Sequence, residues 1–580
     1  MKLPKLDIFG DVKVFLLFAV VRFSSVFIVQ TFFVPDEYYQ SLEVAHKLAF
    51  GYGYLTWEWT QGIRSYFYPL VFAVPYKILY YLGLDSQDAI IYVPRVLQSL
   101  LSAYADVCIY KWSGMKKWAF FIIATSWFWF YMASRTIINT FETSLTAVAL
   151  SKFPWIGKST NQSLTFLWII ASLFMIRPTS AIIGLPLCLF HIIISTKSTI
   201  RIIITEYVPI GAIVLTIFIA LDSIVHGSFI VTPYNFLKFN VFNDVASIYG
   251  VHPWHWYLSN GLPSVLGILI VPFIMATLII LKARKNHPNE LWILGCIVFS
   301  LFILSCLPHK EFRFILPLLP MILYITSKFL AAWSRKANMW HIWLISAVIF
   351  IWNVIPAWYI GYNHQRGTLD VMNILGQFAQ TDSNTSFLFL MPCHSTPLYS
   401  HIHVNVTARF LTCNPNLNNI SSYVDEADAF YHNPNAWLRN NYPPNSNLPS
   451  HIICYDNLLP IIGSDVLTRY KKIKEFFHTN FPSILNWRRP SPQLYESVYV
   501  QQTAVRVYQS VEEATASLAT VVNRPPKRLL CLNEEDKMKP ISLLVAMAMV
   551  IMASASGSLT ALEEFSAGNR LFSARLYKVR

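Results

Sequence analysis

The apolar residues of this chain are gathered in blocks about as long as a membrane-spanning helix, and this pattern limits the possible folds most strongly. A tilted helix needs about 17–25 residues, mostly apolar, to cross a bilayer. Charged residues fill only 13% of the 580 positions, against about 25% in an average soluble domain. The sequence therefore excludes a water-soluble globule and a disordered chain, and it predicts an α-helical polytopic membrane protein. The expected spans are residues 14–33, 66–83, 89–110, 118–133, 136–151, 163–194 (as one or two passes), 207–225, 262–281, 291–307, 313–330 and 340–360.

Basic residues predict how the chain is oriented in the membrane. Lys2, Lys5 and Lys13 precede the first span, so the positive-inside rule places the N-terminus in the cytosol and the loop after Phe33 on the far side. The other basic residues, which bring the net charge to +14, are scattered between the apolar blocks. We interpret them as topology determinants and contacts with anionic lipids, so no nucleic-acid partner is expected.

The composition changes after Tyr362 to Asn, Pro, His and Ser, with short strand-like runs at 386–390 and 451–455. This change predicts a small C-terminal mixed α/β domain over residues 363–482. The residues before it, 1–362, form the expected membrane module.

The C-terminal domain carries N-glycosylation sequons, which favour its exposure to the lumen of the endoplasmic reticulum (ER). With a cytosolic N-terminus, a lumenal domain requires an odd number of crossings, so eleven or thirteen fit better than twelve. In that oxidising compartment Cys393 and Cys413 could form a disulfide and leave Cys454 over, although the sequence leaves the connectivity open. The predicted glycosylation sites are Asn384, Asn405 and Asn419.

Residues 483–580 receive no assignment. They begin charged and irregular and later include the apolar run 541–552. This run is shorter than the roughly 17 residues that a crossing needs, so we expect an interfacial or loose tail.

The first far-side loop, residues 34–65, begins with a proline and two acids. Pro35 followed by Asp36 and Glu37 is typical of a helix N-terminus, and it predicts an interfacial helix that continues to about Ala45. The two acids either cap this helix or supply a general base at the membrane surface.

Aromatic and polar side chains alternate further along the same loop. Tryptophan rings stack on the C–H faces of sugars, but they also populate membrane interfaces as belts. The polar groups between the rings favour a binding site, because they can orient hydroxyl and phosphate groups. The candidate substrate-binding residues of this loop are Trp57, Glu58, Trp59 and Arg64.

A second polar cluster, the HKEFRF stretch, lies between two apolar blocks. His309, Lys310 and Arg313 could bind a phosphate, with Glu311 orienting them. The alternative is a positively charged flank on the cytosolic side.

Intramembrane arginines add to the candidates. Arg135 and Glu142 are seven positions apart, which predicts one helix face and a polar cavity, so Arg135 joins the candidate phosphate ligands. Arg177 lies within an apolar block before Pro178.

A third cluster, the HPWHWY stretch, contains His252, Trp254 and His255. No carboxylate or cysteine follows the two histidines at zinc-site spacing, so we expect substrate contacts here and no metal site. The sequence also lacks a P-loop, a G-x-G-x-x-G after a strand and a G-x-S-x-G elbow, so soluble nucleotide chemistry has no support.

Taken together, these stretches resemble the eukaryotic mannosyltransferases of glycosyltransferase family 22. The resemblance rests on VPDEYYQSLEVAHKLAFGYGYLTWEW at 34–59, HPWHWY at 252–257 and HKEFRF at 309–314. Within that family, the first loop resembles the members that add the third mannose of the glycosylphosphatidylinositol (GPI) precursor. Further stretches similar to those members are HQRGTLDVM at 364–372, MPCHSTPLYSHIH at 391–403 and ARFLTCNPN at 408–416, and the match runs from about residue 30 to about residue 482.

The resemblance implies a GT-C glycosyltransferase architecture in the ER membrane, with an active site that faces the lumen. It implies transfer of mannose from dolichyl-phosphate mannose to the second mannose of the GPI precursor, in an inverting α-1,2 linkage and without a separate cofactor. The catalytic acid of such families falls on Asp36 here, with Glu37 beside it. The expected partners are the lipid-linked donor and acceptor and the ER lipids, while protein partners are not indicated.

Three alternatives remain at this level. A sibling enzyme would add another α-mannose to the GPI precursor or to the lipid-linked N-glycan precursor. A secondary transporter would show internal symmetry and paired broken helices, neither of which the sequence contains. A non-catalytic lipid-binding subunit would still complement after Asp36→Asn.

Overall fold

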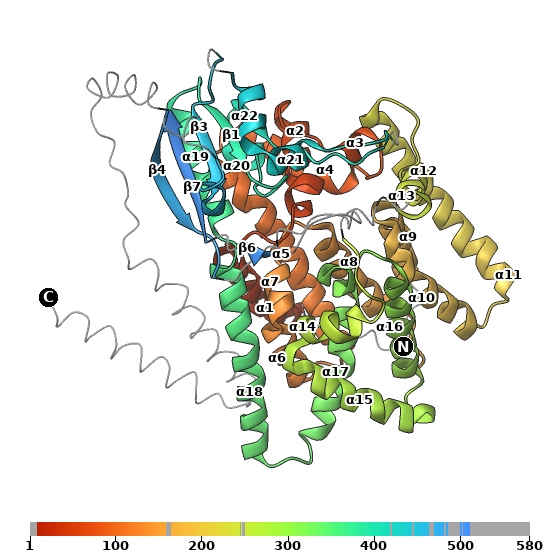
Figure 1. The fold of residues 1–580 in the computed structure, drawn as a ribbon. Coiled ribbons are helices and arrows are strands. Elements are labelled where there is room, and N and C mark those ends of the chain that lie inside the picture. The colour runs from red at the N-terminus through yellow and green to blue at the C-terminus, as the bar shows by residue number, and fades with distance from the viewer. Residues whose placement is uncertain are drawn as a thin grey trace.

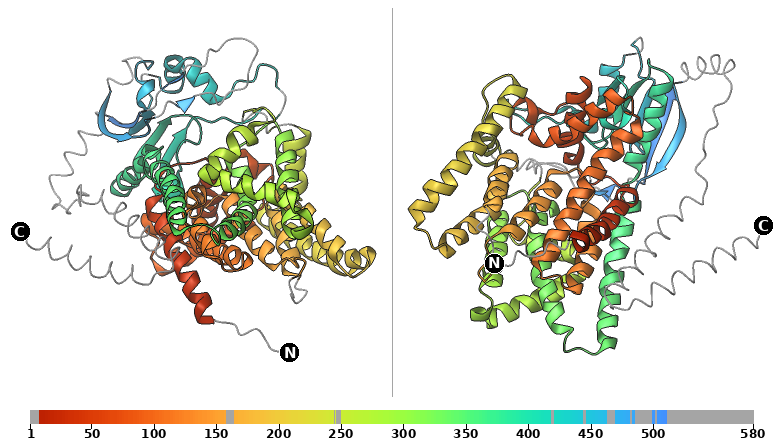
Figure 2. Two further views of the ribbon diagram at one scale, coloured as in Figure 1. Left: turned by 90° about the horizontal axis from the view of Figure 1, so that it is seen from below. Right: turned by 180° about the vertical axis from the view of Figure 1, so that it is seen from behind.

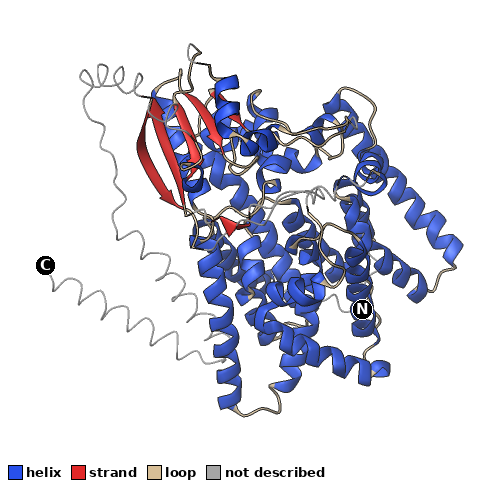
Figure 3. Ribbon diagram, in the orientation of Figure 1, coloured by secondary structure: helices blue, strands red, loops and turns tan. Residues whose placement is uncertain are grey.

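A bundle of helices carries a small mixed β-sheet at one of its ends (Figure 1). This computed structural model describes residues 8–157, 164–243, 245, 250–417, 420–443, 446–462, 469–480, 483–484, 499–500 and 503–510. The strands of the main sheet gather at one corner of the molecule, and helices with their connecting loops make up most of the rest (Figure 3).

The main helices of the bundle coincide with the predicted apolar blocks. Prolines at the starts of helices and left-handed glycines after their ends, such as Pro288 and Gly227, set several boundaries. The main helices are α1 (Ile8–Ile28), α4 (Phe67–Leu82), α5 (Gln87–Trp112), α6 (Lys117–Thr125), α7 (Trp127–Met132), α8 (Ile138–Lys152), α9 (Thr165–Ile176), α10 (Ala181–Ile194), α12 (Val208–His226), α15 (Ile270–Lys282), α16 (Pro288–Cys306), α17 (Leu319–Trp333) and α18 (Met339–Trp358).

Shorter helical segments connect the main helices and build the loops at their ends. In the first loop these segments are η1 (Tyr38–Leu42), α2 (Glu43–Phe50) and α3 (Trp57–Thr60), so the helix predicted from Pro35 to about Ala45 is present and continues to Phe50. The others in the bundle are η2 (Pro178–Ser180), α11 (Thr199–Ile202), η3 (Ile203–Tyr207), α13 (Thr232–Leu237), η4 (Lys238–Phe242), η6 (Tyr257–Gly261), α14 (Leu262–Leu266), η7 (Gly267–Leu269), η8 (Arg284–Asn286), η9 (Phe312–Leu318) and η10 (Tyr359–Asn363).

Two of the predicted spans are broken. The block 118–133 divides at Ser126 into α6 and α7, and the block 163–194 divides at Arg177 into α9 and α10. Arg177 is extended because the following proline disfavours the helical conformation in the residue before it. The second break brings the Arg177 side chain to the end of a helix.

Within the described residues, five helical runs are long and apolar enough to cross a membrane. This agrees with a multi-pass membrane protein, as predicted, and the number of crossings remains a prediction. The five runs are Thr199–His226, Tyr257–Lys282, Pro288–Cys306, Phe312–Trp333 and Met339–Thr381.

The C-terminal domain contains a five-stranded mixed sheet in the order β2-β1-β3-β7-β4. Strand β1 is parallel to β2 and β3, whereas β7 is antiparallel to β3 and β4. The long helix α18 leads from the bundle towards this sheet, and α19 (Gly367–Thr381) follows it (Figure 2). The strands are β1 (Ser386–Leu390), β2 (Thr407–Phe410), β3 (His451–Tyr455), β4 (Tyr470–Phe477) and β7 (Ala504–Ser510), and the domain's helices are α20 (Tyr399–Ile402), α21 (Glu426–His432), α22 (Pro434–Asn441) and η11 (Asp456–Leu458).

The predicted mixed domain is therefore present, but its predicted end at residue 482 is wrong. Strand β7 lies beyond that boundary and pairs with two other strands of the sheet. Its Val505 and Val507 are fully buried, so the sheet would lose part of its core without this segment. A separate pair, β5 (Ser483–Ile484) and β6 (Tyr499–Val500), also lies past the boundary.

Cysteines and sequons of this domain fall where the sequence analysis allowed. Cys393 and Cys413 form a disulfide, and Cys454 is buried and free. Asn384 and Asn405 are exposed, while Asn419 and the apolar run 541–552 lie outside the described residues.

A buried carboxylate makes four of the hydrogen bonds that join the C-terminal domain to the first loop. Glu43, at the start of α2, accepts backbone N–H bonds from Leu398 (2.8 Å), Tyr399 (3.1 Å) and Ser400 (3.1 Å), and a hydroxyl bond from Ser400 (2.6 Å). These donors precede or begin α20, whose first turn would otherwise leave its N–H groups unsatisfied. The first loop and the C-terminal domain are thus held in a fixed relation.

We expect Glu43→Ala to loosen this attachment. Each buried donor that loses its acceptor costs about 1–3 kcal/mol, so the attachment should weaken by about 3 kcal/mol or more. The thermal midpoint in detergent should fall, and limited proteolysis should cut the chain between the two parts. Glu475→Ala is the control, because the Glu475 side chain is 40% exposed and its ion pairs with Lys472 and Arg506 do not involve the first loop. Equal stability of the two variants would show that the Glu43 contacts do not hold the domain.

Candidate active site

An ion pair between Asp36 and Arg313 joins the first loop to the HKEFRF stretch. The Nη1 atom of Arg313 lies 2.5 Å from Oδ2 of Asp36, although the two residues are 277 positions apart. Asp36 lies just before η1, and Arg313 is the second residue of η9. The HKEFRF stretch therefore lies on the same side as the first loop, which excludes its reading as a flank of the opposite membrane face.

Glu311 and His309 hold Arg313 in place. Glu311 accepts bonds from Nε (2.8 Å) and Nη2 (2.5 Å) of Arg313, and its Oε1 lies 3.0 Å from Nε2 of His309. The other ring nitrogen of His309 lies 3.0 Å from the carbonyl of Gly250. Burial raises the pKa of Glu311, but Arg313 and His309 outweigh it and lower this pKa to about 2. Glu311 therefore stays ionised and orients the guanidinium.

Lys310 is placed differently from the prediction of a phosphate ligand. Its ammonium donates to the backbone carbonyls of His252 (3.0 Å) and Leu307 (2.5 Å), and the residue is only 3% exposed. Trp256 packs against Phe312 in the same place, with ring centroids 4.8 Å apart. Lys310 thus ties the HPWHWY segment to the HKEFRF stretch.

The side chains of the HPWHWY segment itself do not join the ion pairs. His252 stacks on Trp256, with ring centroids 4.9 Å apart. Trp254 is 70% exposed, and His255 is exposed as well. The segment supports the HKEFRF stretch through its backbone, and the substrate contacts predicted for these three residues remain predictions.

The two neighbouring acids of the first loop have different surroundings. Glu37 is 3% exposed and pairs with Arg135 at 2.7 Å, whereas Asp36 is 26% exposed. Arg135 also donates to Thr31 (3.1 Å) and lies over the ring of Tyr131. Arg135 is therefore engaged by Glu37 and not by the Asp36–Arg313 pair.

The predicted common helix face of Arg135 and Glu142 is wrong. Helix α8 begins at Ile138, so Arg135 precedes it and Glu142 lies within it. Glu142 pairs instead with Arg177 at 3.1 Å, and the break before Pro178 makes this contact possible. Sequence periodicity could not detect that the helix is interrupted between α7 and α8, where Arg135 lies.

Two further arginine–glutamate pairs surround Asp36. Arg64 pairs with Glu58 at 2.8 Å, and Gln40 donates to the other oxygen of Glu58 at 3.1 Å. Burial lowers the pKa of Arg64, but the carboxylates of Glu58 and Asp36 raise it above its ordinary value. The charges of Asp36 and Arg313 also act on Arg177. Arg313 thus contacts Asp36 directly, while Arg64 and Arg177 lie near enough to be influenced by its charge, and each of the three arginines pairs with a glutamate of its own.

The predicted tryptophans of the first loop lie beside this cluster. Trp59 is 1% exposed, and its indole N–H donates to the carbonyl of Tyr39 at 3.0 Å, so it holds the loop together from inside. The ring of Trp57 contacts Phe239 of η4, with centroids 6.2 Å apart. The buried ring of Trp59 has no free face for a sugar, while sugar stacking by Trp57 remains a prediction.

The C-terminal domain contributes His394 to the surroundings of Asp36. Burial lowers the pKa of His394 to about 4, and the nearby charge of Asp36 opposes this effect. Sequence reasoning missed His394 as a site residue, because a lone histidine in a loop gives no pattern. The available signal was its position directly after a cysteine of the candidate disulfide.

Among the described residues, the cluster Cys393, His394 and Cys413 has ligand atoms close enough together for a metal ion. The two cysteines are joined in a disulfide, so neither is available as a thiolate ligand. This cluster therefore does not suit a metal.

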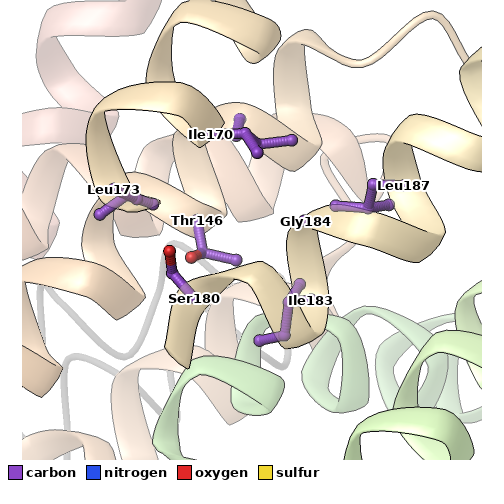
Figure 4. A pocket seen from close by; sticks show the side chains of 8 residues that line it. Thr146, Ile170, Leu173, Ser180, Ile183, Gly184 and Leu187 are labelled. Atoms are coloured by element: carbon purple, nitrogen blue, oxygen red, sulfur yellow. The ribbon is translucent and has the colours of Figure 1, made fainter. Parts of the chain in front are cut away.

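A small pocket lies between α8, α9 and α10 (Figure 4). Its only hydroxyl side chains are those of Thr146 and Ser180, and the remaining lining is apolar or glycine. This lining contains no charged side chain, so the candidate site remains the group of ion pairs around Asp36. The full lining is Thr146, Ala149, Ile170, Leu173, Ser180, Ile183, Gly184 and Leu187.

Comparison with known proteins adds family and fold to this geometry. GPI mannosyltransferase 3 of Drosophila melanogaster is 49% identical over 474 residues, which cover 80% of this chain and 84% of that protein. GPI alpha-1,2-mannosyltransferase 3 of Danio rerio is 42% identical (83% and 89% covered), and that of Homo sapiens is 40% identical (82% and 86% covered).

The crystal structure of ArnT from Cupriavidus metallidurans bound to undecaprenyl phosphate has the same fold. The TM-score is 0.51 at 13% sequence identity, with 87% of this chain and 98% of that chain covered. This likeness confirms the predicted GT-C architecture and concerns the fold alone. Residues 13–403 match the sequence model of the Alg9-like mannosyltransferase family. With this match and relatives 40–49% identical over about four fifths of its length, the chain belongs to the Alg9-like mannosyltransferase family, as the resemblance to glycosyltransferase family 22 predicted.

Proposed function

We propose that this protein transfers mannose from dolichyl-phosphate mannose to the second mannose of the GPI precursor, in an α-1,2 linkage. The relatives that are 40–49% identical are GPI mannosyltransferases 3, two of them named as α-1,2-mannosyltransferases, and this supports the reaction type. The second mannose as acceptor comes from the resemblance found in the sequence. The observation that carries the mechanism is the direct contact of Asp36 with Arg313. It places a carboxylate base beside a cation that can bind a phosphate.

Asp36 is the proposed base, and Glu37 is not. Glu37 is nearly inaccessible and its carboxylate is committed to Arg135, so it cannot reach a substrate hydroxyl. Asp36 remains partly exposed next to the charged cluster. A general base must lie within hydrogen-bond reach of the proton that it removes. Of these two neighbouring acids, Asp36 is the one that a substrate hydroxyl can approach.

Arg313 is the proposed contact for the donor phosphate, with His309 behind Glu311 as its support. A guanidinium offers a planar fork that suits phosphate oxygens, and Glu311 fixes its orientation in advance. Preorganised cations of this kind stabilise a leaving group without rearrangement during the reaction. Arg64 and Arg177 add positive charge around the same point.

The reaction then transfers one proton and exchanges one bond at the anomeric carbon. The acceptor 2-hydroxyl oxygen forms a bond to that carbon on the face opposite the phosphate, and the bond from the carbon to the phosphate oxygen breaks. The hydroxyl proton goes to Asp36, and dolichyl phosphate leaves with the bonding electron pair. Attack from the opposite face inverts the β-linked donor to an α-linked product.

The ER membrane is the proposed location, with the active site on its lumenal side. The chain is a multi-pass membrane protein, and its relatives act in GPI synthesis. The basic N-terminus and the exposed sequons at Asn384 and Asn405 support a lumenal position for the first loop and the C-terminal domain. Both substrates would reach the site from the bilayer, because both carry lipid tails.

The identity of the acceptor can be tested in cells that lack this protein. They should accumulate GPI precursors with two mannoses, and the intact chain should restore precursors with three. The measurement is mass spectrometry of lipid extracts. Normal three-mannose precursors in the deficient cells, or accumulation of a different intermediate, would assign the chain to a sibling reaction.

Asp36→Asn should abolish activity with little change in folding. Loss of a general base lowers the rate about 10²–10⁴-fold, and asparagine keeps the shape and the hydrogen bond from Arg313. Glu37→Gln should keep much of the rate, because Glu37 only pairs with Arg135. Initial rates in microsomes, corrected for protein amount, compare the two variants. A larger loss in Glu37→Gln than in Asp36→Asn would reverse the proposed roles.

Arg313→Lys should impair use of the donor although the charge is kept, because lysine lacks the fork that Glu311 and Asp36 share. We expect kcat/KM for dolichyl-phosphate mannose to fall about 10²-fold, as for loss of one preorganised donor. The matched control is Arg366→Lys, since Arg366 pairs with Asp370 one helical turn away on α19. Unchanged donor dependence in Arg313→Lys would remove Arg313 from the phosphate site.

A further inference from the structure

His394 has a strained backbone at a place where nothing in the fold of the loop requires a histidine. It lies between β1 and α20, directly after Cys393 of the disulfide, and its φ is +59°. Residues other than glycine rarely adopt this left-handed conformation, and such strain is concentrated at functional sites. A turn closed by the bond from the Ser395 N–H to the Pro392 carbonyl (3.2 Å) contains this residue.

Only one of the two ring nitrogens of His394 has a partner within the described part of the chain. Its Nδ1 lies 3.9 Å from the sulfur of Cys413, which is a weak partner. Its Nε2 is buried and has no hydrogen-bond partner within the described part of the chain. Buried polar atoms are nearly always satisfied, so an atom left without a partner calls for a specific explanation.

Aromatic rings enclose this imidazole. The ring centroid of Tyr39 is 4.4 Å from that of His394, and those of Phe410 and Tyr54 are 5.4 and 6.2 Å away. The Tyr39 hydroxyl donates to the carbonyl of Thr396, which keeps the loop and the first-loop helix together. The rings offer apolar faces that suit the C–H surfaces of a sugar ring.

The charge state of the imidazole agrees with a neutral ligand. Burial lowers the pKa of His394 to about 4, so the ring is uncharged near neutral pH. A neutral imidazole can both donate to and accept from a hydroxyl group, but it cannot form an ion pair with a phosphate. The phosphate contacts lie instead at Arg313, which approaches Asp36 from the helical bundle, whereas His394 approaches it from the C-terminal domain.

We propose that His394 is a substrate-contacting residue whose Nε2 binds a hydroxyl of the acceptor sugar beside Asp36, with Tyr39, Tyr54 and Phe410 lining the subsite. This inference rests on the proposed function and adds the acceptor side of the same site. The ligand is a hexopyranose ring of the acceptor glycan, not the mannose of the donor. The contact would hold the attacking hydroxyl within reach of the base.

The test distinguishes the effect of the left-handed backbone from the effect of the imidazole ring. His394→Gly keeps the left-handed backbone without strain and removes the ring. His394→Asn also tolerates this backbone and retains a polar group, so it should recover part of the function. The control is His403→Gly, because His403 also has a left-handed backbone (φ +50°) in this domain, but its ring is bonded to His46 at 3.0 Å.

The measurement is steady-state kinetics in microsomes, with the acceptor and the donor varied separately. We expect His394→Gly to raise KM for the two-mannose acceptor at least tenfold and to leave KM for dolichyl-phosphate mannose within twofold. His394→Asn should fall between His394→Gly and the unaltered protein, and His403→Gly should not change KM for the acceptor. Disulfide formation, followed on non-reducing gels, checks that each variant has folded.

Three outcomes would overturn the inference. They are an unchanged acceptor KM in His394→Gly, an equal rise in both KM values, and a rise confined to the donor. If His394→Gly does not accumulate, the same criteria apply to His394→Asn and His394→Gln. Failure of the proposed function is a separate result, because the unaltered protein would then not convert two-mannose precursors at all.

Discussion

The ion pair of Asp36 and Arg313 is the contact on which the rest of the site depends. It joins two segments 277 positions apart, and it fixes both the direction of the carboxylate and the position of η9. Charges that are partly removed from water near a bilayer need a partner of opposite sign. In the proposed reaction the base removes a proton while the phosphate leaves, and both events occur close to one carbon atom. The ion pair keeps the base, Asp36, next to Arg313, which binds the phosphate.

Arg313 is shared in a way that suits the proposed transfer of charge. As Asp36 takes the proton, it loses its negative charge, while the departing phosphate gains one. The total charge that faces Arg313 therefore stays constant, and the guanidinium needs only to change its partner. Glu311 keeps it in position throughout, and Glu58 and Glu142 do the same for Arg64 and Arg177. Such preorganisation avoids the energy that water would need to reorient around the moving charge.

The sequence predicted the parts of this molecule that depend on local patterns. Block length alone places α4 and α5 within two residues at each end, because an apolar helix must match the thickness of a bilayer. The pairing of Arg135 with Glu37 joins residues 98 positions apart, and no local period records it. Strand β7 was missed because the charged sequence before it shows no strand pattern, although Val505, Val507 and Tyr508 are buried as in a strand. The sequence identified the acid of the first loop and the HKEFRF stretch as candidates, but their contact could be seen only in the three-dimensional structure.

The position of Asp36 explains why the chain needs two parts. The helical bundle supplies arginines, which suit a lipid-linked phosphate that arrives from the bilayer. The C-terminal domain supplies neutral and aromatic groups, which suit a glycan. Glu43 helps to hold the two parts together through buried hydrogen bonds, and it is the first residue of α2, seven positions after Asp36. The base therefore lies at the boundary between the two parts, where a charged donor and an uncharged sugar can meet. This boundary must be rigid, because a displacement of the reacting groups by about 1 Å would lower the rate about 10²-fold.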